Sequence, residues 1–299
     1  MTAMSMRPVA TARGVDIFCP KIGKFAFLKS PFAAHTTLSA VDIYSGGTFG
    51  DIAPSPVKGE VIDIREYLSP TPFKDRDFME YIIAIRQDDS VVKILHSKPV
   101  VDVGDTVDVG DPLGILIKNG YFYFWNEPPL HVEVRDVGDY IRASNDNPLL
   151  TKFSFSGSDF SMESIIKCRV VFCDEKFALL KGDYQGDGVK GYELGGGLLD
   201  GIIPLGDWDA IDYFGLVGMD VPVPYLKSIG NRFMISAKYV TASLSTENEV
   251  SCRALGFSLS FCEPTIKLIP LKYGEKLFDV GDCVDIKLNL LNDPEVKIK

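Results

Sequence analysis

Three histidines are the residues of this sequence best suited to metal binding or acid–base chemistry. They are His35, His96 and His131, and the chain of 299 residues contains no other histidine. A neutral imidazole binds metal ions and exchanges protons near neutral pH. A single histidine is more often structural, so the sequence around each one decides how it is interpreted.

The segments around these histidines follow one another in a defined order. His35 begins HTTLSAVDIY, which contains Asp42, and PVKGEV follows at 56–61. His96 comes directly after the apolar run VVKIL and precedes GDTVDVGDPLG at 104–114. His131 begins HVEV and is preceded by PPL.

This order resembles the lysostaphin/LytM-type zinc endopeptidases, which cut peptidoglycan cross-bridges. That family has a histidine shortly before an aspartate on a strand, then a Pro-Val hairpin and a strand ending in histidine. A Gly-Asp hairpin and a His-x-His-Phe-Glu-Val strand complete the pattern. The resemblance covers roughly residues 35–135 and implies a small β domain of the duplicated-hybrid-motif or barrel-sandwich type.

The resemblance also implies a metal site. It places His35, Asp42 and His131 on or near the three positions that bind zinc in the family. Two imidazoles and one carboxylate leave the fourth tetrahedral position open to water, which the ion acidifies. His96 falls on the position of a catalytic histidine that stabilises the oxyanion or orients the water. Glu133 matches a family position that supports the ligands.

Two features depart from the family pattern. Six residues separate His35 from Asp42 where the family has three, and the usual ligand position is Leu38. His35 can replace that ligand only if the loop 36–40 folds back. The first histidine of the His-x-His pair, the general base of the family, is Pro129 here, which cannot take a proton.

Most of the chain has the pattern of short strands. Runs such as VKGEVIDI, YIIAIRQ and KCRVVFC alternate apolar with polar residues between clusters of turn residues. We therefore predict a mostly β protein, with short helices at Asp63–Leu68, Asp75–Tyr81 and Asp207–Phe214. The turn cluster ASNDNP at 143–148 predicts a boundary between a peptidase-like domain, residues 1–150, and a second β-rich domain, residues 151–299.

The second half contains no motif that carries a chemical mechanism. Its FDVGDCVDI at 278–286 resembles VDVGDTVDV at 101–109 in the first half. We interpret both as hairpins with the same turn chemistry, in which glycine adopts positive φ and aspartate bonds the turn backbone.

Composition excludes several classes of function. The 41 acidic and 31 basic residues give a formal charge of −10, which disfavours nucleic-acid binding. No stretch approaches the 18 apolar residues of a membrane span, and the N-terminus lacks the apolar region of a secretion signal. The six cysteines form no CxxC pair. We therefore expect a cytoplasmic protein with no membrane and no nucleic-acid partner.

Three functions remain open at this point. We favour a metal-binding, peptidase-like protein with zinc as cofactor and a peptide or protein ligand, a divergent relative in which Pro129 impairs hydrolysis and which is a candidate pseudoenzyme. The first alternative is an active zinc peptidase or amidase with altered catalytic residues. The second is a structural or partner-binding β protein without metal. The sequence carries no signal of oligomeric state.

Overall fold

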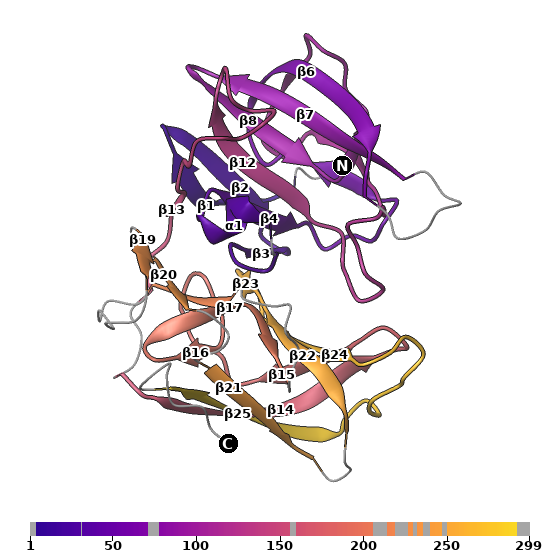
Figure 1. Cartoon of the computed structure of the whole chain (residues 1–299), viewed down its shortest axis with the longest axis vertical. Helices are drawn as coiled ribbons and strands as arrows, with labels where there is room; N and C mark the ends of the chain where they lie inside the picture. The colour runs from indigo at the N-terminus through magenta and orange to yellow at the C-terminus, as the bar shows by residue number, and fades with distance from the viewer. Residues whose placement is uncertain are drawn as a thin grey trace. The chain divides into compact units, whose positions relative to one another are not determined.

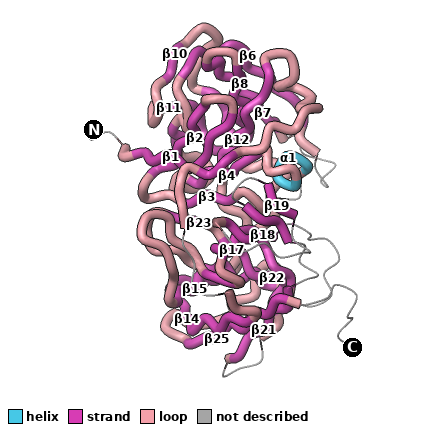
Figure 2. Tube along the Cα trace, turned by 90° about the vertical axis from the view of Figure 1, so that its left-hand side faces the viewer, coloured by secondary structure: helices cyan, strands magenta, loops and turns pink. Residues whose placement is uncertain are grey.

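The computed structural model describes residues 4–30, 32–70, 78–155, 160–205, 214–218, 227–229, 232–235, 240–246 and 250–291. Strands dominate it (Figures 1 and 2), which confirms the prediction of a mostly β protein. In this part of the chain the one helix is α1, a single turn over Ala33–Thr36. No helix within the described residues is long and apolar enough to cross a membrane.

The chain divides into two compact units. The first comprises Met1–Phe25 and Thr37–Lys152, and the second comprises Ala26–Thr36 and Phe153–Lys299. One reason for this exchange is a buried carboxylate: Oδ2 of Asp200 accepts hydrogen bonds from the backbone amides of Phe27 at 2.6 Å and Leu28 at 3.1 Å. The sequence-based division at residue 150 did not anticipate the transfer of 26–36.

The strands up to residue 151 form three sheets. They are β1 (Met6–Ala12), β2 (Val15–Pro20), β3 (Lys24–Ala26), β4 (Ala40–Tyr44), β5 (Ile52–Pro54), β6 (Gly59–Leu68), β7 (Met79–Gln87), β8 (Ser90–Leu95), β9 (Ser97–Pro99), β10 (Thr106–Val107), β11 (Pro112–Leu116), β12 (Leu130–Asp136) and β13 (Leu150–Thr151). Two sheets are small, with the orders β13-β1-β2 and β5-β11-β9.

The third sheet carries Asp42 and His131. Its order is β10-β6-β7-β8-β12-β4-β3, and its pairs from β10 to β4 are antiparallel. Figure 1 shows β6, β7, β8 and β12 side by side in this order. The central strands β8, β12 and β4 are buried on both faces over almost their whole length. Charged residues in these strands are therefore removed from water, which is costly unless they are paired.

The prediction of a helix over Asp63–Leu68 is wrong. These residues form the second half of β6 and pair with β7, with Ile64 opposite Ile83 and Leu68 opposite Met79. The ladder of cross-strand hydrogen bonds overrides the weak helical pattern. Of the other two predicted helices, 75–77 and 207–213 lie outside the described residues. Phe78 has no regular structure, 79–81 belong to β7, and Phe214 begins β18 (Phe214–Val217).

The two resembling hairpins do share their turn chemistry. In Asp102–Asp105 the second aspartate accepts a hydrogen bond from the backbone N–H of the first at 2.8 Å, and Asp279–Asp282 repeats this bond at 2.9 Å. A third copy at Asp108–Asp111 has it at 2.8 Å. The glycine before the second aspartate has positive φ in each turn, +99°, +104° and +92° respectively. Local turn chemistry therefore accounts for the repeated DVGD.

The second unit is built on one large sheet. Its further strands are β14 (Glu163–Cys173), β15 (Ala178–Gly182), β16 (Glu193–Leu194), β17 (Gly197–Pro204), β19 (Lys227–Ile229), β20 (Arg232–Ile235), β21 (Val240–Ser245), β22 (Cys252–Phe257), β23 (Leu259–Ser260), β24 (Ile266–Pro270) and β25 (Cys283–Leu290). The strand order of the large sheet is β19-β20-β18-β17-β22-β24-β15-β14-β25-β21. The short strand β16 pairs with β17 beside this path, and β23 is not part of this sheet. Along β14, Ile166, Cys168 and Val170 are buried while their neighbours are exposed, the alternation of a sheet with one face on a core.

Candidate metal centre

Strands β12 and β4 bring His131 and Asp42 together. The strands pair antiparallel with these two residues directly opposite each other. Both side chains are buried, and Nδ1 of His131 lies 3.2 Å from Oδ1 of Asp42. Leu130 and Val132 point to the opposite face of the sheet, because side chains alternate along a strand.

Glu133 lies on the other side of the His131 ring. It is two residues further along β12, so it shares the face of His131, and its Oε1 lies 2.8 Å from Nε2 of the imidazole. Nε of Arg135 donates to Oε2 of Glu133 at 2.6 Å, and Nζ of Lys93 lies 3.6 Å from Oε1. The imidazole therefore faces a carboxylate at each nitrogen, inside a buried network of charges.

These carboxylates decide the protonation of His131. Burial alone lowers the pKa of His131, but the hydrogen bonds to Asp42 and Glu133 outweigh it and raise the pKa to about 9. Burial raises the pKa of Glu133, yet the bond with His131 brings that pKa well below its usual range. In the absence of metal, His131 is thus an imidazolium at neutral pH. An ion at Nδ1 would displace one proton, and Glu133 would accept the hydrogen bond from Nε2, as carboxylates behind metal-bound imidazoles do.

His35 lies on α1, shortly before β4. It is fully buried, and its Nδ1 donates a hydrogen bond to the carbonyl oxygen of Phe27 at 2.6 Å. A proton fixed on Nδ1 makes Nε2 the nitrogen with a lone pair to offer a metal ion. Because Phe27 is itself bonded to Asp200, the backbone that orients His35 is tied to a buried carboxylate of β17.

The structure groups the three predicted ligands. His35, Asp42 and His131 each offer one ligand atom, and these atoms all lie within 4.8 Å of one another. Ligand atoms around a tetrahedral zinc ion are about 3.3 Å apart, so bound metal requires the group to contract by up to about 1.5 Å. The chain returns from α1 to β4 through Leu38, whose φ of +57° is left-handed. This reversal takes up the longer spacing between His35 and Asp42.

His96 follows β8 and lies beside His131. Its Nδ1 is 2.5 Å from Oε2 of Glu80, and its backbone N–H donates to Oε1 of the same carboxylate at 2.9 Å. The ring centroids of His96 and His131 are 6.0 Å apart. His96 is therefore next to the ligand group without belonging to it.

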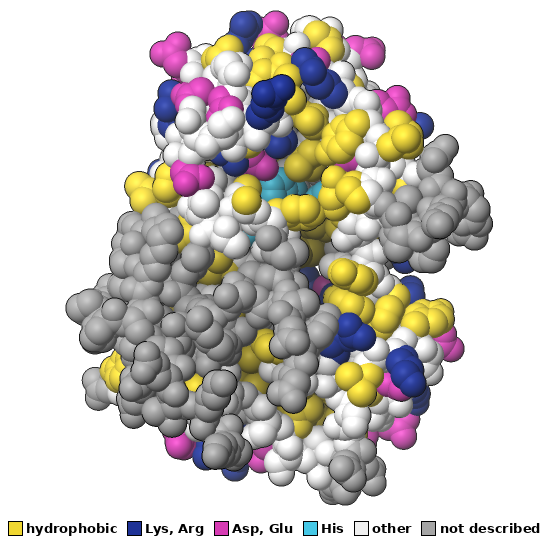
Figure 3. All heavy atoms as spheres, in the orientation of Figure 1, with side chains coloured by type: hydrophobic (Ala, Val, Ile, Leu, Met, Phe, Trp, Pro, Cys, Tyr) yellow, Lys and Arg dark blue, Asp and Glu magenta, His cyan; other side chains and the backbone are white. Residues whose placement is uncertain are grey.

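Pro129 lies immediately before β12. It is buried and carries no group that can accept a proton. Figure 3 shows histidine atoms on one face among hydrophobic side chains, but all three histidines are buried, His35 completely and His96 and His131 with 5% and 3% of their surface exposed. Any acid–base chemistry here needs a donor or acceptor other than residue 129.

Sequence reasoning missed three charged residues of this centre: Glu80, Lys93 and Arg135. Each is nearly or fully buried; Glu80 and Lys93 stand in mostly apolar runs, MEYIIAI and SVVKIL, and Arg135 alternates with apolar residues in LHVEVRD. An unpaired charge buried in a sheet costs several kcal/mol, on the order of 3–5, so such residues need partners. A charge within an apolar strand was therefore the available signal.

The profile of one protein family matches residues 16–151. Its description is the N-terminal domain of a domain of unknown function, DUF8155. The matched segment includes His35, Asp42, His96 and His131, and its description names no activity. Neither a curated protein nor a solved structure matched the chain.

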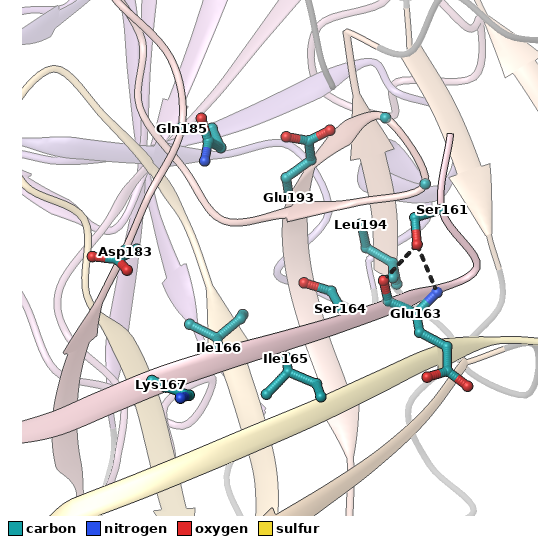
Figure 4. Close-up of a pocket in the computed structure, with 12 residues that line it drawn as sticks. Ser161, Glu163, Ser164, Ile165, Ile166, Lys167, Asp183, Gln185, Glu193 and Leu194 are labelled. Atoms are coloured by element: carbon teal, nitrogen blue, oxygen red, sulfur yellow. Dashed lines mark hydrogen bonds between the residues drawn. The ribbon is translucent and has the colours of Figure 1, made fainter. Parts of the chain in front are cut away.

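The second unit has a hollow of about 420 Å³ between β14 and the turn after β16. Figure 4 shows the side chains that line it, among them Glu163, Asp183 and Glu193. The hydroxyl of Ser161 donates to the carbonyl oxygen of Glu163 at 2.8 Å and accepts from its N–H at 3.3 Å. The hollow is a solvated groove whose hydroxyl is engaged with local backbone.

Proposed function

We propose that the first half of the chain is a metal-binding, peptidase-like module that holds a divalent ion on His35, Asp42 and His131. The observation that carries this proposal is the approach of the three ligand atoms to within 4.8 Å. Two imidazoles and one carboxylate favour zinc, and three protein ligands leave a coordination position for water or substrate.

The surroundings of the ligands support this proposal. His35 is oriented by the Phe27 carbonyl and His131 by Glu133, the kind of hydrogen bond that directs imidazoles toward a metal. Bound there, the ion would acidify a water molecule and polarise a carbonyl group, the chemistry of peptide hydrolysis. The substrate class that suits this chemistry is a peptide or protein.

A second candidate is a partner-binding β protein without metal. One observation favours it: the imidazolium of His131 is balanced by Asp42 and Glu133, and Glu133 is further paired with Arg135 and Lys93. This network compensates its charges in the absence of an ion.

Metal content decides between the two. The full chain is purified without chelators, incubated with zinc, freed of excess ion and analysed for bound metal, together with His131→Ala and His96→Ala. We expect about one zinc per chain in the wild type and in His96→Ala, and little in His131→Ala. Thermal melting of each variant checks that it is folded.

Wild-type protein that retains no metal after loading contradicts the proposal and leaves the partner-binding candidate. Full retention of zinc by a folded His131→Ala variant also contradicts it, because the ion would then be held elsewhere.

A further inference from the structure

A single buried carboxylate holds His96 at two points. Oε2 of Glu80 is 2.5 Å from Nδ1 of the imidazole, and Oε1 accepts the backbone N–H of His96 at 2.9 Å. Glu80 is fully buried on β7, and His96 follows the neighbouring strand β8. Both the ring and the backbone of His96, whose φ is +72°, are thereby fixed relative to the sheet.

The remaining bonds of Glu80 define which atoms carry protons. Oε1 also accepts the backbone N–H of Tyr81 at 2.8 Å, and Oε2 accepts Nδ2 of Asn119 at 2.9 Å. Asn119 is oriented in turn, because its Oδ1 accepts the N–H of Tyr121 at 3.1 Å. Burial raises the pKa of Glu80, but the hydrogen bond with His96 outweighs it and lowers that pKa. An ionised carboxylate surrounded by donors requires the proton of His96 to be on Nδ1.

In the neutral form of His96, the ring nitrogen opposite Glu80 is then an acceptor. With the proton on Nδ1, Nε2 of His96 carries a lone pair, and the ring centroid lies 6.0 Å from that of His131. The arrangement is that of a base oriented by a buried carboxylate, the pattern that activates a nucleophile in many hydrolases.

We propose that Glu80 is a positioning residue that holds His96 with Nε2 as proton acceptor, and that this pair acts as the general base beside the proposed metal site. In hydrolysis, the oxygen of water bonds to the acyl carbon while its proton passes to Nε2. The bond from the acyl carbon to the leaving group then breaks, and the leaving group takes that proton. This inference rests on the proposed metal-binding function, which supplies the site where the water attacks.

Glu80→Gln is the decisive variant. The two backbone N–H groups at Oε1 require the amide oxygen of glutamine in that place, so the amide nitrogen must face Nδ1 of His96 and Nδ2 of Asn119. Nδ1 would then have to accept a hydrogen bond, and the proton would move to Nε2. The variant loses the bond from Asn119, whose Nδ2 still has the carbonyl oxygen of Met79 at 3.3 Å as acceptor, and it is expected to reverse the tautomer of His96.

Nitrogen-15 NMR of histidine-labelled full-length protein measures this directly, because the chain has only three histidines. His96→Ala assigns the resonances. We expect His96 to be protonated on Nδ1 in the wild type and on Nε2 in Glu80→Gln. Glu66→Gln is the matched control, since Glu66 lies on β6, is exposed and bonds the hydroxyl of Tyr81 instead, and its spectrum should be unchanged. A wild-type His96 protonated on Nε2, or an unchanged tautomer in Glu80→Gln, overturns the positioning role.

Hydrolysis of p-nitrophenyl acetate by the zinc-loaded proteins tests the base. General base catalysis contributes on the order of 10²–10⁴-fold, so Glu80→Gln and His96→Ala should both lose at least about 10²-fold. Equal rates in wild type and His96→Ala overturn the base even when the tautomer is as expected. Metal content measured on the same samples separates this failure from failure of the proposed function.

Discussion

His131 and Asp42, 89 residues apart in the chain, lie opposite each other on β12 and β4 with Nδ1 3.2 Å from Oδ1. This one relationship would serve two states of the proposed metal site. Without metal it is a buried ion pair, because the pKa of His131 is raised to about 9. If the proposed ion binds, these two side chains would become neighbouring ligands, and the ion would compete with the proton of His131.

The first prediction follows from that competition. Only the neutral imidazole binds metal, and the pKa of His131 in the metal-free protein is about 9. Apparent zinc affinity should therefore rise about tenfold per pH unit up to about pH 9, with close to one proton released per ion. Calorimetric titration in two buffers of different ionisation enthalpy measures the released proton. An affinity that does not change between pH 6 and 8 would contradict the combination of a raised His131 pKa and a His131 ligand.

The second prediction concerns the buried network around Glu133. Glu133→Gln leaves Arg135 and Lys93 buried without their carboxylate, which should destabilise the first unit by about 3–5 kcal/mol. Glu60→Gln is the matched control, since Glu60 pairs with Arg86 where both side chains are about half exposed, and it should cost less than about 1 kcal/mol. Urea denaturation gives both values. Similar losses in the two variants would contradict the structural role of the network.

The third prediction concerns pH and Asp200. Burial raises the pKa of Asp200 to about 7, although the backbone N–H of Phe27 opposes this shift. In the unfolded chain the same carboxyl has its ordinary pKa of 3.8. As pH rises from about 4 to 7 the unfolded state loses its proton first, so the free energy of unfolding falls, in total by about 4 kcal/mol.

Asp200→Asn removes this dependence. The free energy of unfolding of the variant minus that of the wild type should therefore be larger at pH 8 than at pH 5 by roughly 3 kcal/mol, because only the wild type loses stability as pH rises. Denaturation of both proteins at the two pH values is the measurement. Asp187→Asn, at an exposed position, should show the same difference from wild type at both pH values. If Asp200→Asn behaved in this way too, the carboxyl would not be buried as described.

The fourth prediction compares two hairpin glycines of the first unit. A Cβ at Gly59, whose φ is +146°, would collide with the backbone oxygen of Arg86 across the β6–β7 ladder, whereas a Cβ at Gly104, with φ of +99°, would meet nothing within 4 Å. Gly104→Ala should therefore cost about 1–2 kcal/mol from backbone strain alone, and Gly59→Ala about 3 kcal/mol or more. Thermal melting ranks the two. A Gly104→Ala variant as damaging as Gly59→Ala would refute the steric argument.

Local patterns in the sequence predicted the class of fold and the turns. Alternation of apolar and polar residues in KCRVVFC predicts a strand with one buried face, and β14 has that burial pattern. The DVGD turns were predictable for the same reason, since glycine conformation and the side chain of aspartate act within four residues. The helix predicted over Asp63–Leu68 failed because cross-strand pairing, a nonlocal interaction, decided its conformation.

The order of His35, Asp42, His96 and His131 in the sequence was enough to single out the candidate site. Only the tertiary structure decided their partners. Strand pairing placed Asp42 opposite His131, and the fold of β7 against β8 brought Glu80 to His96. Periodicity states which face of a strand a side chain occupies, but the register between strands determines which side chain it meets. That register depends on hydrogen bonds and packing across the whole sheet, which no local pattern contains.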